Sequence, residues 1–332
     1  MAAASMASRA RALALRLCSS DRAMSQSLPQ GRIAFESLSG CYSNAIYYTL
    51  NRHSGYESPQ TRTVRSVMPP LRIAPAITMN ASPRYSTTGI DAEGIAMGLL
   101  QICTLPSGPW NDPTAPGLGA VEREMIVEQW DVGSRTDWLS MIDFLSIERR
   151  RRHAWMLHLS ARNQRAATLG RPPRTQEWLA GIDHEGGDVS DARPFVAGLE
   201  LIEREVRRSV GEDLIAPHLF VRTLDGYALG QAVAMTTWGV ALGYADIAEA
   251  RQIIHRISTE ARPSFESWAD FGLSYLAGRI MHWSDGTVDE TAIEKFGDGW
   301  RDLKTALSSR RGPWAALPWR TAQDLSTSRR TG

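Results

Sequence analysis

The chain has 332 residues, of which 43% are hydrophobic and 22% are charged, so it is long enough and apolar enough to bury a core. Its 37 basic and 36 acidic residues leave a formal net charge of +1, which excludes a global attraction to nucleic acid or to an anionic membrane. Cys18, Cys41 and Cys103 lack the spacing of a disulfide framework or of a metal site. We therefore expect a soluble, cytoplasmic protein with no metal and no other cofactor.

The N-terminal third carries few signals of regular structure. Residues 1–23 are rich in Ala, Ser and Arg, which is the composition of an organelle transit peptide, but we favour an over-extended start with Met24 as the true initiator. Residues 24–118 include several prolines that interrupt any long helix. Apolar spacing predicts one helix in this region, Ile90–Leu105, and the rest is expected to be irregular.

The next part of the chain, residues 119–310, is predicted to be a helical domain. Ser134, Asp246 and Ser267 each stand where an N-cap residue would begin a helix. Strand-like alternation is nearly absent after residue 120. The fold class is therefore mainly α, an irregular multi-helix bundle with a poorly regular N-terminal third, followed by a flexible tail over residues 311–332. Further helices are expected over Glu148–Ala167, Asp191–Ser209, Gly226–Tyr244 and Thr291–Leu307.

The segment Gly226–Tyr244 has 19 residues and no charge, which is just enough to span a bilayer as a helix. It contains several glycines and polar residues, however, and no basic residue flanks it to set an orientation. A helix buried in the core of a soluble domain explains this composition better. Gly239 and Gly243 would then allow a neighbouring helix to approach closely.

Three segments carry a family resemblance. They are Trp130–Arg135 continuing through Trp138 to His153, Gly226–Gln231 with Trp238, and Ser267–Phe271 with Tyr275, Gly278-Arg279 and Trp283. Together they resemble a bacterial family catalogued as domain of unknown function 1266, over roughly residues 120 to 285. The resemblance implies a cytoplasmic helical domain and implies no reaction.

The chain also departs from the family's pattern. Relatives usually carry an acidic residue and an arginine in the second segment, where this chain has Ala228 and Gln231. Any chemistry that depended on that acid and that arginine would be lost here.

Arg279 lies on a predicted helix that is apolar on both faces, so it is expected to be largely buried. A buried arginine needs a carboxylate or several carbonyls. We favour a structural ion pair with a helix-end acid such as Asp143 or Asp131; the alternative is an anion-binding arginine that lines a cleft.

Ser267 is interpreted as a helix cap rather than a nucleophile, because it lacks the strand-turn-helix context of a nucleophilic serine.

The run Arg149–Arg152 precedes His153 and is most simply a solvated helix face, or alternatively a phosphate-binding patch. His153 and His158 are five positions apart and point in different directions on a helix, so they do not form a metal site. The acidic loop Asp183–Asp188 fails the spacing of a calcium loop and is expected to be a solvated connection.

Three functions are compatible with these residues. The first is a non-catalytic interaction or regulatory module that uses an aromatic-lined groove, because aromatic side chains and arginine are common anchors at interfaces. The second is an enzyme that acts on an anionic small molecule, with Arg279 and Arg152 as clamps and His153 as acid or base. The third is a weak nucleic-acid or phosphate binder through Arg149–Arg152.

No catalytic residue is assigned. The expected partner is an unknown protein or a small anionic ligand, with no membrane, and we favour either of these over a nucleic acid. The candidate binding residues are Arg152, His153, Tyr227, Trp238, Trp268, Tyr275 and Arg279.

Overall fold

Short polar side chains begin several of the helices, as predicted. In the computed structural model, which describes residues 79–319, Ser134, Asp246 and Ser267 each accept a hydrogen bond from the backbone N–H three residues further on. The helices that they cap are α6 (Arg135–Asp143), α11 (Ile247–Ala261) and α12 (Trp268–Trp283). Such caps pair N–H groups that the helix itself leaves without an acceptor. The predictions for residues 1–78, including a start at Met24, lie outside the described residues.

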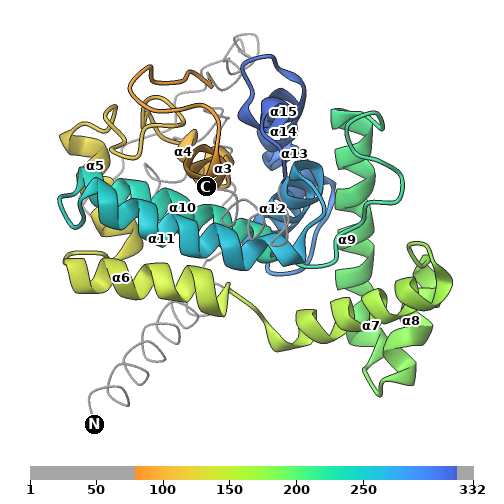
Figure 1. Ribbon diagram of the computed structural model, residues 1–332. Helices are drawn as coiled ribbons and strands as arrows, with labels where there is room; N and C mark the ends of the chain where they lie inside the picture. Colours follow the sequence, from red (N-terminus) through yellow and green to blue (C-terminus); the bar gives the residue numbers. More distant parts are fainter. Residues whose placement is uncertain (1–78, 320–332) are drawn as a thin grey trace, which may run out of the picture. The chain divides into compact units, whose positions relative to one another are not determined.

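The predicted uncharged helix is the centre of the core. It is α10 (Asp225–Ala241), and every residue from Asp225 to Gly239 is buried. Helix α10 packs against α12, α11 and α6, and Figure 1 shows α10 and α11 lying along each other. Among the described residues, no helix is long and apolar enough to cross a membrane.

The two glycines near the end of α10 have different roles. A Cβ atom added to Gly239 would lie 2.2 Å from the ring of Trp138, whose Nε1 donates to the carbonyl of Met235 at 2.8 Å. Gly239 therefore allows the close approach that was predicted. Gly243 has open space around it and a φ of +79°, so it serves the turn after the helix, and the prediction of close packing there is wrong.

Three helices form one end of the structure, drawn in green tones in Figure 1. Helix α8 (Thr175–His184) packs against its neighbours in sequence, α7 (His153–Leu169) and α9 (Val189–Val210). Helix α9 also packs against α12 and α14 (Gly297–Ser308). Residues 79–319 contain no strand, so the mainly α prediction is confirmed. The bounds of these and the remaining helices are α3 (Ile90–Ala96), α4 (Leu99–Ile102), α5 (Ala120–Trp130), α7 (His153–Leu169), α8 (Thr175–His184), α9 (Val189–Val210), α13 (Glu290–Lys295), α14 (Gly297–Ser308) and α15 (Pro313–Ala316), with a 3-10 turn at Arg262–Ser264.

Two predicted helices are each divided in the structure. The one expected over Ile90–Leu105 is α3 and α4, and the one expected over Thr291–Leu307 is α13 and α14. Gly98 lies at the first break, where an added Cβ would meet Val233 at 2.8 Å. The helix is therefore interrupted at Gly98, where the chain packs closely against α10.

The ends of the described chain belong to the same core as its middle. The Nε1 of Trp314, in α15, donates to the carbonyl of Ala96 at 2.8 Å, and that of Trp319 donates to the carbonyl of Phe265 at 2.9 Å. Arg262 and Glu93, both fully buried, form an ion pair at 3.1 Å. The prediction of a flexible tail from residue 311 is therefore wrong as far as Trp319, because its tryptophans bury large apolar surfaces. Residues 79–118 likewise share this core.

Candidate functional site

The four consecutive arginines lie on a loop and not on a helix face. A π-helical turn, η2 (Phe144–Glu148), ends at Arg149, and α7 begins only at His153. Arg149 and Arg150 have φ values of +57° and +52°, in the left-handed region that non-glycine residues seldom adopt. Such conformations cost on the order of 1–3 kcal/mol each and persist where surrounding contacts hold them. The predicted helix over Glu148–Ala167 is thus wrong in its first turn.

Asp225 holds this loop against the start of α10. Its carboxylate accepts hydrogen bonds from Arg149 Nη1 at 3.0 Å and from Arg151 Nε at 3.0 Å, with a further contact from Arg151 Nη2. Burial alone would raise the pKa of Asp225, but the hydrogen bonds and positive charges of Arg151 and Arg149 outweigh it and keep that pKa below its ordinary value. One buried carboxylate is thereby shared by two guanidinium groups.

The other two loop arginines surround His282 of α12. Arg150 Nε donates to Gln231 Oε1 at 2.9 Å, and its Nη1 lies 3.4 Å from His282 Nε2. Arg152 forms an ion pair with Asp285. Burial, followed by the positive charges of Arg150 and Arg152, lowers the pKa of His282 to about 3. The imidazole is therefore neutral near pH 7 and lies in a positive environment.

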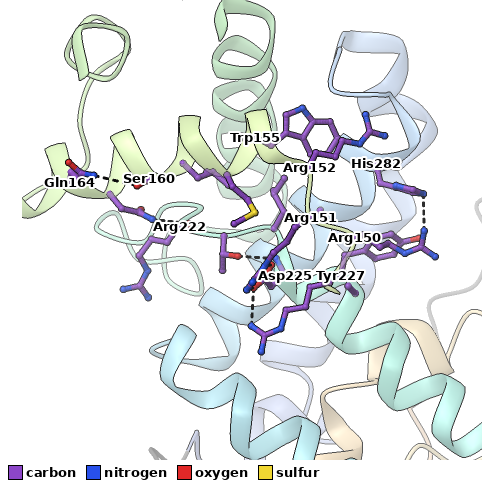
Figure 2. Close-up of a pocket in the computed structure, with 18 residues that line it drawn as sticks. Arg150, Arg151, Arg152, Trp155, Ser160, Gln164, Arg222, Asp225, Tyr227 and His282 are labelled. Carbon is purple, nitrogen blue, oxygen red and sulfur yellow. Dashed lines mark hydrogen bonds and ion pairs between the residues drawn. The ribbon is translucent and has the colours of Figure 1, made fainter. Parts of the chain in front are cut away.

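These groups surround a pocket with a volume of about 360 Å³, shown in Figure 2. One wall is a stripe on α7, and the facing wall combines the segment before α10, the first turn of α10, and α12. Five arginines line it, and Asp225 is the one carboxylate among the described residues of its lining. We call this the arginine pocket. Its lining includes Arg149, Arg150, Arg151, Arg152, Trp155, Met156, Leu159, Ser160, Asn163, Gln164, Arg222, Thr223, Asp225, Tyr227 and His282.

A family described as "Protein of unknown function (DUF1266)" matches residues 125–319. The chain belongs to this family. The matched region contains the whole arginine pocket and, in contrast to the expected limit near residue 285, continues to Trp319. No curated protein and no solved structure matches the chain. The two positions that were expected to depart from the family pattern are at the pocket, since Ala228 lines it and Gln231 accepts from Arg150.

The aromatic residues expected to line a groove are mostly inside the core of this family member. Trp238, Trp268 and Tyr275 are 1%, 4% and 0% exposed, so solvent does not reach a groove formed by them. Tyr227 lines the arginine pocket, although it is 5% exposed. These side chains therefore make packing contacts in the core and do not form the expected groove, because helices α10 and α12 bury both of their faces.

The residues expected to form an enzyme site do not converge. Arg152 lines the pocket, whereas His153 is exposed and Arg279 is half-buried, and neither is part of the lining. The guanidinium of Arg279 lies 5.5 Å from the ring centre of Phe296. The expected ion pair with Asp143 is not formed, since Asp143 pairs with Arg256 at 3.4 Å.

Sequence reasoning missed Asp225, His282 and Arg222 as parts of the site. The run of four arginines was a usable signal for a phosphate-binding patch, but nothing in it indicated a loop. Within residues 79–319, no group of three or more His, Cys, Asp or Glu side chains could hold a metal ion. The loop expected over Asp183–Asp188 is shorter than predicted, because Asp183 and His184 are the last residues of α8, and Asp188 caps α9 by accepting from the N–H groups of Ser190 and Asp191.

Proposed function

We propose that this protein binds a small anionic ligand in the arginine pocket. The observation that carries the proposal is the lining of five arginines and one carboxylate around a volume of about 360 Å³. Small-molecule sites have volumes of roughly 300–1,000 Å³. Guanidinium groups match carboxylate and phosphate oxygens with paired donors, which makes arginine the usual residue for recognising these anions.

Arg151 is the arginine best placed to contact the ligand. Its side chain is 38% exposed, while Asp225 beneath it is 5% exposed. Because Arg149 shares the same carboxylate, the two guanidinium groups keep one positive charge in excess. Arg149 is the more buried of the two and acts as a positioning residue, whereas Arg151 is the more exposed of these two lining residues.

Arg152 supplies a second charge at the pocket entrance. It pairs with Asp285, whose side chain is 86% exposed, and such surface pairs are held by at most about 1 kcal/mol. An incoming anion can therefore compete for Arg152.

The protein would thus be a non-catalytic binding module whose site consists of arginines and not of the aromatic residues expected from the sequence. The enzyme alternative that used His153 loses its support, since that side chain lies outside the pocket.

Calorimetric titration of the full chain with inorganic phosphate, at low ionic strength, tests the proposal. We expect saturable binding to one site that weakens about tenfold in Arg151→Ala, which corresponds to one lost charged hydrogen bond of about 1.4 kcal/mol. Arg204→Ala is the matched control, because Arg204 is an exposed arginine of α9 that does not line the pocket. Equal losses in both variants, or no binding to the wild-type chain, would contradict the proposal.

A further inference from the structure

The arginine pocket has two chemically different ends. In Figure 2, Ser160, Gln164 and Arg222 lie on one side, Arg150, Arg152 and His282 lie on the other, and Arg151 and Asp225 lie between them. The α7 stripe that connects the ends runs from Trp155 to Gln164. At 1.5 Å per residue this is a span of about 13 Å. An isolated phosphate group would therefore fill only a part of the pocket.

The end near Arg222 does not form a second anion site. The guanidinium of Arg222 is paired with both Glu266 and Asp270, so two carboxylates face one positive charge. The anionic group of a ligand is consequently directed away from Arg222 and toward Arg151 and Arg152, where the carboxylates are fewer or exposed.

Neutral hydrogen-bonding groups line the end near Arg222. Ser160 and Gln164 are exposed and are joined to each other by a single long hydrogen bond of 3.4 Å. Asn163 donates through Nδ2 to the carbonyl of Arg222 at 3.0 Å, while its buried Oδ1 accepts no hydrogen bond within the described part of the chain. The hydroxyl of Ser160 and the amide of Gln164 suit a ligand that carries hydroxyl groups.

The aromatic side chains of the lining offer little surface on which a nucleobase could stack. The ring of Trp155 is covered by the guanidinium of Arg152 at 4.2 Å and packs against Phe195 at 5.8 Å. Tyr227 is buried and meets the ring of Tyr275 edge to face at 5.4 Å. Recognition of a ligand beyond its anionic group thus depends on hydrogen bonds rather than on stacking.

From these contacts we infer that the ligand is a phosphorylated polyhydroxy compound, that is, a sugar phosphate. This inference rests on the proposed function. The phosphate would bind beside Arg151 and Arg152, because its three oxygens and its charge of about −1.5 to −2 near pH 7 match several guanidinium donors. The hydroxyl groups would reach Ser160 and Gln164, with the carbon skeleton against Leu159.

Calorimetric titrations of the full chain with inorganic phosphate, ribose 5-phosphate, glucose 6-phosphate and adenosine monophosphate test the inference. We expect one of the two sugar phosphates to bind at least tenfold more tightly than inorganic phosphate. The double variant Ser160→Ala, Gln164→Ala should remove this gain, so that the sugar phosphate binds no more tightly than inorganic phosphate. Both side chains are exposed, so the fold is retained. Gln176→Ala is the control, since Gln176 is exposed on α8 and outside the pocket.

The outcomes separate the two proposals. Sugar phosphates that bind no more tightly than inorganic phosphate would overturn the inference and leave the anion site standing. Tighter binding of the nucleotide that is insensitive to the double variant would also overturn it. Absence of binding by every phosphate compound would overturn the proposed function together with the inference.

Discussion

Arg151 lies beside Asp225, a residue 74 positions further along the chain, and donates to both of its carboxylate oxygens. Arg149 donates to the same carboxylate from the opposite end of a short loop. These contacts join the loop between α6 and α7 to the first residue of α10 and hold Arg149 in its left-handed conformation. The pocket wall therefore depends on a single buried acid.

Asp225→Asn is expected to destabilise the fold by about 3 kcal/mol, because two guanidinium groups lose the carboxylate that they share. Urea denaturation measures the change. The control is Asp285→Asn, in which an exposed partner of Arg152 is neutralised, and its cost should stay below about 1 kcal/mol. Equal effects of the two substitutions would show that Asp225 does not have this role.

His282 should make the stability of the fold depend on pH. Its pKa is about 3 in the folded chain and about 6.5 when unfolded, so below pH 6.5 the unfolded state takes up the proton first. Stability is therefore unaffected by this group above pH 6.5 and falls as the pH is lowered from 6.5 toward 3, by about 2 kcal/mol at pH 5. The free energy of unfolding, measured at several pH values, should lose this component in His282→Asn. The exposed His153→Asn variant should retain it, and a parallel profile for both variants would refute the assignment.

Gly239→Ala should destabilise the fold by about 3 kcal/mol through overpacking, since the new Cβ would overlap the buried ring of Trp138. Trp138 cannot move aside easily, because its Nε1 is bonded to the carbonyl of Met235. Thermal unfolding of this variant and of Gly133→Ala gives the comparison. Gly133 has no neighbouring atom within 4 Å, so its substitution should be nearly neutral. A stable Gly239→Ala protein would contradict the packing described for α6 and α10.

The ion pair between Arg162 and Glu203 is expected to be essential to the end formed by α7, α8 and α9. Both side chains are buried, and two hydrogen bonds of 2.6 and 3.0 Å join them. Glu203→Gln removes one charge of a buried pair and should cost about 3 kcal/mol or more in urea denaturation. In the exposed pair of Arg135 and Glu249, Glu249→Gln should cost less than about 1 kcal/mol. A similar small cost for both would mean that the buried pair is not required.

Local signals in the sequence predicted the helix starts well. Ser134, Asp246 and Ser267 cap their helices because a cap side chain and the backbone N–H that donates to it lie within three residues of each other. The uncharged stretch of α10 was likewise sufficient to predict a buried helix. These features depend on neighbours along the chain, which the sequence displays directly.

The candidate site depends on contacts that the sequence does not display. The loop at Arg149 contains no glycine or proline, and its acid partner Asp225 is 76 positions away. The tail was misjudged for the same reason, since Trp314 bonds to a carbonyl 218 positions earlier. Aromatic richness also could not distinguish a groove from a core, because Trp268 and Tyr275 are residues that either environment would favour.

A crystal structure of the protein soaked in tungstate, an anomalously scattering analogue of phosphate, tests the central claim most directly. The proposal predicts an anomalous peak in the arginine pocket, within hydrogen-bond distance of the Arg151 guanidinium, that disappears in Arg151→Ala crystals. Peaks confined to other surfaces, with the arginine pocket containing none, would contradict the claim that this pocket binds anions.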